Sequence, residues 1–166
     1  MKEDNFKVLK TLSEATARMD LKMFAQKVNL DQNRTIDVMQ ELAKEGFLQK
    51  IGHGFAMTEK GKAALKALTP IPEEKGFQFY LDVGKPLGLT ALTLEEFYKL
   101  VSQVPSESLD FHLSRGDFEK WFTEVYNEKD VSNEIGGIKC AGFQGDELRE
   151  ELRKTLELKF GADKLS

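Results

Sequence analysis

The stretch LDQNRTIDVMQELAKEGFLQKIGHGFAMTEKGKAAL, residues 30–65, decides the fold predicted for the first part of this chain. Asp31 is a natural cap for a helix that carries inward apolar residues at helical spacing and stops at Gly46. Two short apolar runs around the sequence GHG then predict a β-hairpin, and Thr58 is placed to cap a further helix. The stretch therefore predicts helix, hairpin and helix in that order.

Two more helices are predicted before this stretch. Phe6, Leu9 and Leu12 recur at helical spacing, and a second apolar stripe covers about residues 21–28. The sequence NLD then makes a tight turn into the helix that Asp31 caps. The resulting order, with two helices before the helix, hairpin and helix, is typical of a winged helix, which we expect to span residues 1–68.

The same stretch resembles archaeal and bacterial winged-helix transcription regulators. In those proteins a leucine four residues before a Gly-aromatic or Gly-aliphatic pair ends the recognition helix, as in ELAKEGFL here. A T-E-K-G tetrad opens the helix after the wing, as at residues 58–61. The pattern is also similar to the winged helices at the N-terminus of phenylalanyl-tRNA synthetase alpha subunits. The resemblance implies the fold, but the fold alone does not fix the partner.

A helix that reads DNA presents polar side chains from its N-terminal half to base edges in the major groove. Asn and Gln side chains bond to adenine, Arg bonds to guanine or phosphate, and Lys beside the wing contacts phosphate. Asp37 opposes this interpretation, because a carboxylate is repelled by phosphates, and an amphipathic helix also has a solvated polar face without any ligand. The predicted nucleic-acid-binding residues are Gln32, Asn33, Arg34, Ile36 and Gln40 on the helix, and Lys50, His53 and Lys60 at the wing.

Composition narrows the function classes. Residues 1–70 hold 12 Lys and Arg against 9 Asp and Glu, a balance of +3, whereas the remaining residues hold 12 against 19, a balance of −7. This asymmetry weakly favours a polyanion as the partner of the first half. One cysteine, Cys140, and two histidines predict no disulfide, no metal and no cofactor. Without a long apolar run or an apolar signal core at the N-terminus, we expect a cytoplasmic protein that does not enter a membrane.

A second domain is expected over residues 76–166, after a short linker at residues 69–75. The sequence FQFYLDV predicts a strand with Phe77, Phe79 and Leu81 on one face, and LTAL is a candidate partner strand. The rest is predicted to be mostly helical, with capping boxes at Thr93 and Ser114. The glycine-rich stretch at residues 136–145 is predicted to be a loop before a last helix. The predicted fold class is therefore mainly α (α+β).

The stretch FHLSRGDFEKWF, residues 111–122, gathers polar side chains of the kinds found in active sites. A Ser and a His two residues apart do not by themselves give a nucleophile and its base, so we predict no catalytic residue and no enzyme. We interpret Ser114 and Asp117 as the start of a helix and His112 as a buried or half-buried structural residue. The helix would bury a stripe of four residues, Phe118, Trp121, Phe122 and Val125.

Residues 76–160 resemble an uncharacterised archaeal family, a domain of unknown function. The motifs that carry this resemblance are an A-x-x-L-x-E-F helix start, an S-x-x-F-H-x-x-R-G-D-F-x-x-W core and a late G-x-x-L-R helix. The resemblance implies an archaeal source and no particular activity.

Three functions stay open from the sequence. The first is a DNA-binding transcription regulator whose second domain dimerises, with FQFYL pairing across a two-fold axis, or senses a partner. The second is an RNA- or ribosome-associated factor that grips a nucleic-acid backbone with Lys50, Lys60 and Lys62. The third is a protein-interaction adaptor that binds another protein through Ile36 and its neighbours.

Overall fold

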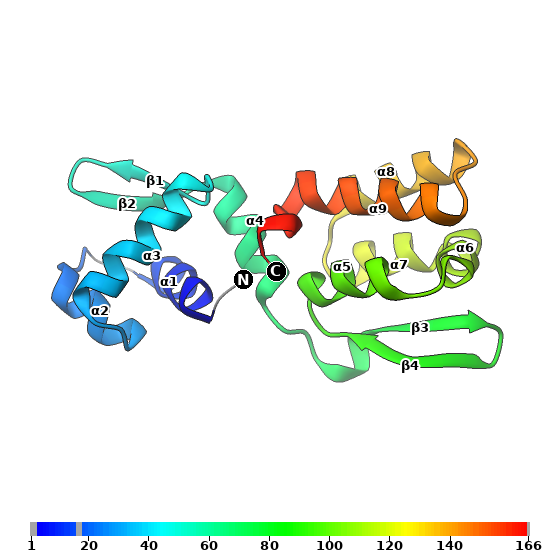
Figure 1. Cartoon of the computed structure of the whole chain (residues 1–166), viewed down its shortest axis with the longest axis horizontal. Helices are drawn as coiled ribbons and strands as arrows, with labels where there is room; N and C mark the ends of the chain where they lie inside the picture. Colours follow the sequence, from blue (N-terminus) through cyan, green and yellow to red (C-terminus); the bar gives the residue numbers. More distant parts are fainter. Residues whose placement is uncertain (1–2, 16–17, 166) are drawn as a thin grey trace. The chain divides into compact units, whose positions relative to one another are not determined.

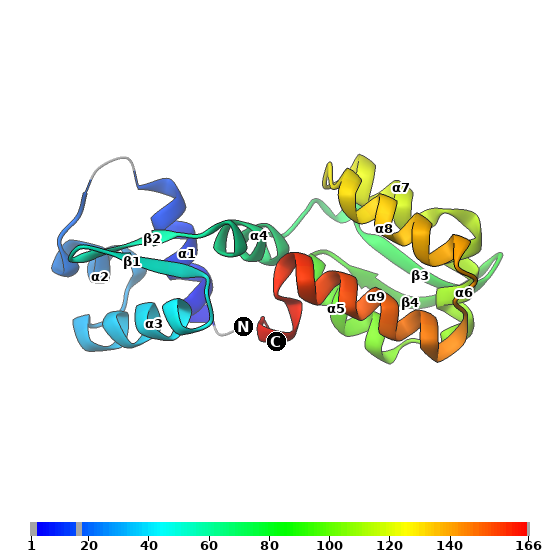
Figure 2. The ribbon, with the colours of Figure 1, turned by 90° about the horizontal axis from the view of Figure 1, so that it is seen from above.

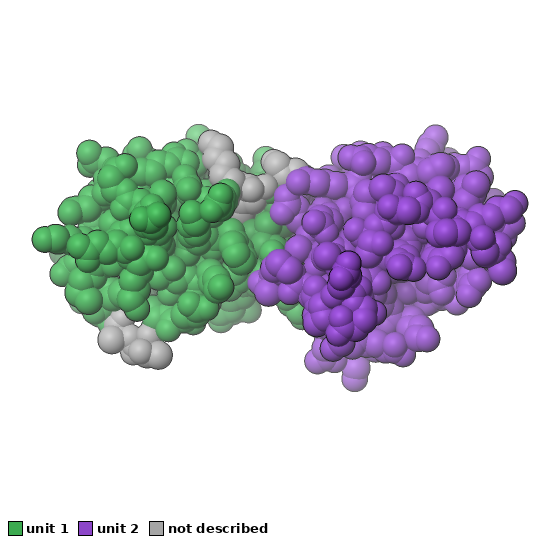
Figure 3. Space-filling view, turned by 90° about the horizontal axis from the view of Figure 1, so that it is seen from below, with its two compact units in different colours: residues 1–68, 163–166 green, residues 69–162 purple. Residues whose placement is uncertain are grey.

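The computed structural model describes residues 3–15 and 18–165. Contacts divide the chain into two compact units, coloured separately in Figure 3. The first unit is Met1–Leu68 with Asp163–Ser166, and the second is Thr69–Ala162. The described residues are mainly helical with two small antiparallel hairpins, which confirms the predicted fold class. Within this described part, no helix combines the length and the apolar character needed to cross a membrane.

The first unit has the predicted order of elements (Figures 1 and 2). In chain order they are α1 (Glu3–Glu14), α2 (Leu21–Val28), α3 (Gln32–Lys44), β1 (Leu48–Ile51), β2 (Gly54–Met57) and α4 (Glu59–Leu68). Helix α1 contacts α2, α3 and α4, and the hairpin β1–β2 joins this core through its contacts with α1, α3 and α4. The apolar stripes predicted from the sequence face inward, with residues such as Leu9, Phe24 and Leu42 buried. The unit is thus held together by a single core around α1.

The ends of these helices are fixed by side chains that the sequence makes recognisable. The Asp31 carboxylate accepts a hydrogen bond from the Arg34 backbone N–H at 2.8 Å and so caps α3. Thr58 Oγ1 accepts from the Gly61 N–H at 3.0 Å and donates to the Gly46 carbonyl at 2.6 Å. A Cβ atom at Gly61 would overlap the backbone carbonyl of Phe47, so only glycine fits there. The T-E-K-G tetrad therefore joins the end of α3 to the start of α4.

The second unit is built in three layers (Figure 1). The hairpin contacts α5 and α6, the helices α5, α6 and α7 form the middle layer, and α8 and α9 cover them. The elements in chain order are η1 (Glu73–Lys75), β3 (Phe77–Asp82), β4 (Lys85–Ala91), α5 (Leu94–Gln103), α6 (Ser106–Arg115), α7 (Asp117–Glu124), α8 (Lys129–Cys140) and α9 (Gly145–Phe160); a short helix η2 (Ala162–Lys164) follows.

Aromatic rings fill the space between the hairpin and the middle layer. Phe77, Phe97, Phe118 and Trp121 lie with ring centroids 4.9–5.6 Å apart.

The hairpin β3–β4 differs from its prediction at both strands. Phe77 and Phe79 are buried as expected, but Leu81 is 39% exposed. The ladder shifts register after Phe79 and again after Tyr80, so the simple alternation of faces is lost before Leu81. The partner strand is longer than LTAL and begins four residues earlier, at Lys85. Ahead of the hairpin, the predicted linker holds η1 and lies within the second unit.

One of the two predicted capping boxes is confirmed and the other is wrong. Thr93 Oγ1 accepts from the Glu96 N–H at 2.9 Å, and the Glu96 carboxylate accepts from the Leu92 N–H at 2.7 Å. Ser114 instead lies in the last turn of α6, where its hydroxyl donates to the Phe111 carbonyl. The residue that ends α6 and begins α7 is Gly116, with a φ of 74°.

Alanine substitutions should separate these two positions. We expect Thr93→Ala to lower the free energy of unfolding by about 1 kcal/mol, because it removes a helix cap. Ser114→Ala should change it by less than about 0.5 kcal/mol, as for an exposed residue that caps nothing. Urea unfolding followed by circular dichroism measures both. A loss at Ser114 equal to that at Thr93 would restore the capping role predicted from the sequence.

The loop predicted at residues 136–145 is wrong for its first half. Gly136 and Gly137 lie inside α8, which ends only at Cys140. Their neighbours Ile135 and Ile138 are buried, so packing of these side chains holds a helix that two adjacent glycines disfavour. Tertiary packing thus overrides local propensity here. The final helix is confirmed, with Leu148, Leu152 and Leu156 buried along one face.

Candidate nucleic-acid interface

The outer face of α3 carries the centre of the predicted interface. Thr35, Val38, Met39 and Leu42 are buried against the core. Because a helix repeats about every 3.6 residues, the face opposite to them is a line of four exposed residues. These are Asn33, Asp37, Gln40 and Lys44. The structure therefore brings Asn33 and Gln40 onto one surface, with the Asp37 carboxylate between them.

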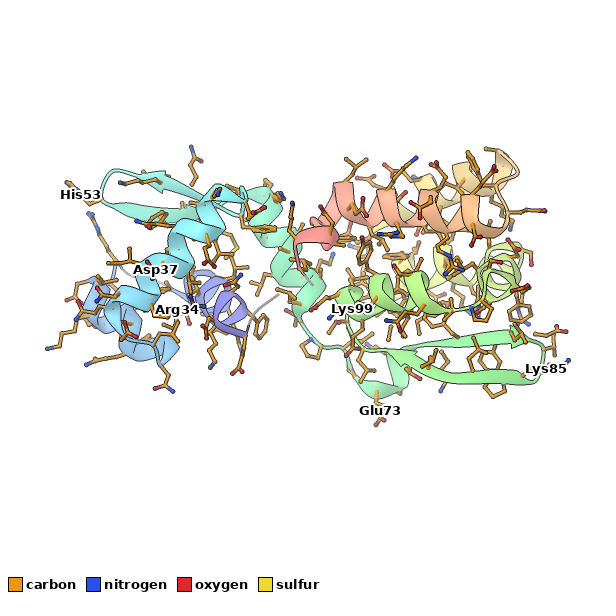
Figure 4. The ribbon with its side chains drawn as sticks, viewed as in Figure 1. Arg34, Asp37, His53, Glu73, Lys85 and Lys99 are labelled. Atoms are coloured by element: carbon orange, nitrogen blue, oxygen red, sulfur yellow. The ribbon has the colours of Figure 1, made fainter. Side chains whose placement is uncertain are left out.

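The other predicted residues of α3 lie on its two flanks. Gln32 is exposed and Ile36 is half-buried on one side. On the other side Arg34 is held by α1, because its Nε and one terminal nitrogen both lie 3.0 Å from Asp4 Oδ2. Figure 4 shows Arg34 and Asp37 on α3. The guanidinium of Arg34 must leave this ion pair, or share it, before it can contact a base or a phosphate.

The predicted wing residues fall into two groups. Lys50 on β1 and His53 at the end of the hairpin are exposed, and Figure 4 labels His53 there. Lys60 lies in the first turn of α4 and its amine donates to the Glu45 carbonyl at 2.8 Å. The same amine lies 4.8 Å from the centre of the Phe47 ring. Lys60 therefore helps to hold the end of α3 and is not a free cation beside the wing.

The charge on this unit is mixed. Asp37 and Glu41 are exposed one turn apart on α3, and both carboxylates would repel a phosphate backbone. Two further carboxylates, those of Asp20 and Asp31, accept backbone hydrogen bonds as helix caps and keep their negative charge. The exposed cations that make no ion pair or hydrogen bond within the described part of the unit are Lys10, Arg18, Lys22, Lys27, Lys44 and Lys50. Of these, only Lys50 was singled out from the sequence.

Lys22 and Lys27 are candidate phosphate contacts that the sequence reasoning missed. Both are exposed on α2, the helix that precedes α3. In helix-turn-helix proteins the first of these two helices crosses the nucleic-acid backbone. The sequence feature that could have identified them is their position on α2 outside the buried stripe of Phe24, Ala25 and Val28.

The polar cluster of the second unit has a structural use. Ser108 Oγ donates to the Tyr80 carbonyl at 2.7 Å, and His112 Nε2 accepts from the Tyr80 N–H at 2.9 Å. His112 Nδ1 lies 2.8 Å from Asp117 Oδ2, to which it donates in the tautomer that these contacts require. Ser108 and His112 thus give β3 the hydrogen bonds that a neighbouring strand would give. The predicted burial of His112 is confirmed, with 3% of the residue exposed.

These contacts limit what His112 can do chemically. Burial lowers the pKa of His112 below its ordinary value of 6.5, although the Asp117 carboxylate opposes this effect. The neutral imidazole has one acceptor nitrogen, and the Tyr80 N–H occupies it. A general base needs a free acceptor within reach of a substrate proton. His112 is therefore a poor candidate for acid–base catalysis.

Comparison of the chain with models of protein families, with curated proteins and with solved structures gives no match. The resemblances noted in the sequence therefore stay expectations.

Proposed function

We propose that the first unit is a winged-helix domain that binds duplex DNA and that the protein is a transcription regulator. In this proposal α3 enters the major groove and the hairpin β1–β2 is the wing. The observation that carries the proposal is the exposed pair of amides on α3. Asn33 and Gln40 stand about two helical turns apart on the outermost line of a helix whose opposite face is buried.

Each exposed side chain has a defined task in this proposal. The amides of Asn33 and Gln40 can each donate to and accept from the major-groove edge of adenine. Lys50 on the hairpin, with Lys22 and Lys27 on α2, contacts phosphates and supplies affinity that depends on salt. Asp37 lowers affinity for every sequence, since its carboxylate lies on the same line as the two amides.

Protein binding is the second candidate function, and two exposed apolar side chains favour it. Ile51 at the end of β1 is 59% exposed and Met23 on α2 is 51% exposed. Exposed apolar side chains of this size are typical of protein–protein contacts when they gather in one patch. Binding of an RNA backbone has less support, because the Lys60 amine donates to the Glu45 backbone carbonyl and Lys62 pairs with the Glu59 carboxylate.

Pairing of β3 across a two-fold axis is not part of the proposal. Tyr80 in the middle of β3 already has its N–H and carbonyl bonded by His112 and Ser108. The other strand, β4, is a poor edge for pairing because it carries Lys85 and Pro86 and its ladder is irregular. A regulatory role for the second unit therefore has to use another surface.

Reversal of one wing charge tests DNA binding. We expect Lys50→Glu to weaken binding of mixed genomic duplexes roughly tenfold at low salt and to lower the salt slope by about one. The Lys50 side chain is exposed and bonded to no other described residue, so the change should leave the fold intact. Fluorescence anisotropy at several salt concentrations gives both values. The matched control is Lys129→Glu, which makes the same charge change at an exposed position of α8.

The two variants have to differ for the proposal to stand. If Lys50→Glu and Lys129→Glu bind DNA with the same affinity and salt slope as the original protein, the hairpin does not contact nucleic acid. Circular dichroism of both variants confirms that they are folded.

A further inference from the structure

The second unit contains a cleft of about 760 Å³. It is lined by η1, the hairpin β3–β4 and the helices α6 and α7. All of these elements belong to the second unit, whereas α3 belongs to the first. A cavity of this size accommodates a small organic molecule.

The deepest polar groups of the cleft are already occupied. His112 is bonded to Tyr80 and Asp117, and the Trp121 indole N–H donates to the Lys75 carbonyl at 2.8 Å. These side chains shape the cleft without offering a free hydrogen-bonding group from the imidazole or the indole. A ligand must therefore be recognised by the less buried side chains of the lining.

Arg115 is the lining residue best prepared to bind. Its guanidinium lies 5.0 Å from the centre of the Phe111 ring, and its Nε lies 3.5 Å from Asp117 Oδ2. Its two terminal nitrogens make no hydrogen bond within the described part of the chain, and 52% of the side chain is exposed. A guanidinium held in place with its outer edge free matches the paired oxygens of a carboxylate or a phosphate.

Other lining residues complete the chemistry of the site. Lys120 on α7 is exposed, its side-chain amine has no bonded partner in the described chain, and it adds a positive charge to that of Arg115. Tyr80, Phe111 and Val83 give apolar surface beside the cations, and 73% of Val83 is exposed. We propose that this cleft binds a small organic anion with a flat apolar body, whose carboxylate or phosphate group pairs with Arg115 and Lys120.

The acidic residues of the lining set the orientation of the ligand. Glu124 lies seven residues after Asp117, about two turns farther along α7. Glu74 belongs to η1, where the exposed Lys75 also lines the cleft and offsets the Glu74 charge, so Glu124 is the uncompensated acid at this end. Since Trp121 donates to the Lys75 carbonyl, η1 lies beside the later part of α7. The anionic group is therefore expected at the Arg115 end, and removal of the Glu124 charge should strengthen binding. The proposal does not depend on DNA binding by the first unit.

Two probes of equal shape and different charge test the proposal on the full chain. These are 2-naphthoate and its uncharged analogue 2-naphthamide. Trp121 is the single tryptophan and lines the cleft, so its indole N–H signal in ¹H–¹⁵N NMR reports occupancy. We expect 2-naphthoate to shift this signal saturably with a dissociation constant of about 1 mM, and 2-naphthamide to bind roughly tenfold more weakly or not at all.

Variants then locate the anion. Arg115→Gln should weaken 2-naphthoate binding roughly tenfold, and Arg115→Lys should restore only part of it because the paired donors are lost. Glu124→Gln should tighten binding, and the control Lys129→Gln should leave it unchanged. The remaining NMR signals show whether each variant is folded.

Three results would overturn the proposal. One is the absence of any saturable shift with 2-naphthoate. Another is equal binding of the charged and uncharged probes, which would indicate an apolar cleft without anion recognition. The third is equal 2-naphthoate affinity for Arg115→Gln and Lys129→Gln, which would remove Arg115 from the site.

Discussion

Replacing Trp121 with alanine is expected to lower the free energy of unfolding by about 3–5 kcal/mol, the range for removal of a large buried side chain. Only 6% of Trp121 is exposed, and its ring meets Phe77, Phe97 and Tyr126 with centroids 4.9–5.4 Å apart. Its indole N–H also holds the Lys75 carbonyl. The substitution therefore leaves a cavity and removes the hydrogen bond between α7 and η1.

Urea unfolding followed by circular dichroism at 222 nm, a wavelength at which helix content is read, measures this loss. Trp121→Phe keeps most of the ring and loses the hydrogen bond, so a smaller loss than for alanine is expected. A loss below about 1 kcal/mol for Trp121→Ala, the range of surface substitutions, would mean that the indole is not part of the core.

Replacing His112 with phenylalanine is expected to lower the free energy of unfolding by about 2–3 kcal/mol. The ring volume is nearly kept, but the Tyr80 N–H loses its acceptor and Asp117 loses the imidazole N–H. The Tyr80 N–H lies beside a buried ring and cannot readily bond to water instead. The matched control is Ser114→Ala on the same helix, which should be close to neutral.

The same residue should make stability depend on pH. Because burial holds the pKa of His112 below its ordinary value of 6.5, the unfolded chain binds a proton at a higher pH than the folded chain. The stabilisation by neutral His112 is therefore fully present above about pH 6.5 and is lost as the pH falls below it.

Urea unfolding of the original protein and of His112→Phe between about pH 5 and pH 7.5 separates this effect from other titrations, because phenylalanine has no proton to bind. The variant should lose less stability than the original protein as the pH falls. Identical pH dependence of the two proteins would exclude His112 as the cause.

The first unit was largely predictable because its signals are local. Asp31 caps α3 by bonding to a backbone N–H three residues later, and Thr58 bonds to the Gly61 N–H in the same way. Such short-range contacts leave residue types at fixed spacings that can be read directly. The periodic apolar stripes then give the buried face of each helix.

The errors in the second unit have two causes, a local break between helices that resembles a helix cap and packing that the sequence does not show. Ser114 looked like a helix cap because it comes shortly before Asp117 and Phe118, as a cap would. The left-handed backbone at Gly116 ends α6 there instead, so Ser114 belongs to the preceding helix. Gly136 and Gly137 looked like a loop because the burial of Ile135 and Ile138 is not visible in the sequence. The exposure of Leu81 depends on register shifts against β4.

The candidate interface shows the same division. Asn33 and Gln40 were placed on the outer face of α3 by periodicity, and the structure exposes both. Arg34 and Lys60 were not foreseen as bonded residues, because their partners Asp4 and Glu45 are 30 and 15 positions away in the chain. Residue type alone shows that a cation is present but does not show that the Asp4 carboxylate pairs with Arg34 or that the Glu45 backbone carbonyl holds the Lys60 amine.

The central claim is that α3 reads DNA, and one set of titrations tests it most directly. The measurement uses two duplexes of equal length, one selected from random fragments and one scrambled. Each duplex is titrated with the original protein and with the variants Asn33→Ala, Asp37→Asn and Ile36→Ala. We expect Asn33→Ala to lose about 1–3 kcal/mol of binding free energy on the selected duplex and less on the scrambled one. Asp37→Asn should bind both duplexes more tightly, because it removes a carboxylate from the outer face of α3. The contradicting result is that neither polar substitution changes the affinity for either duplex.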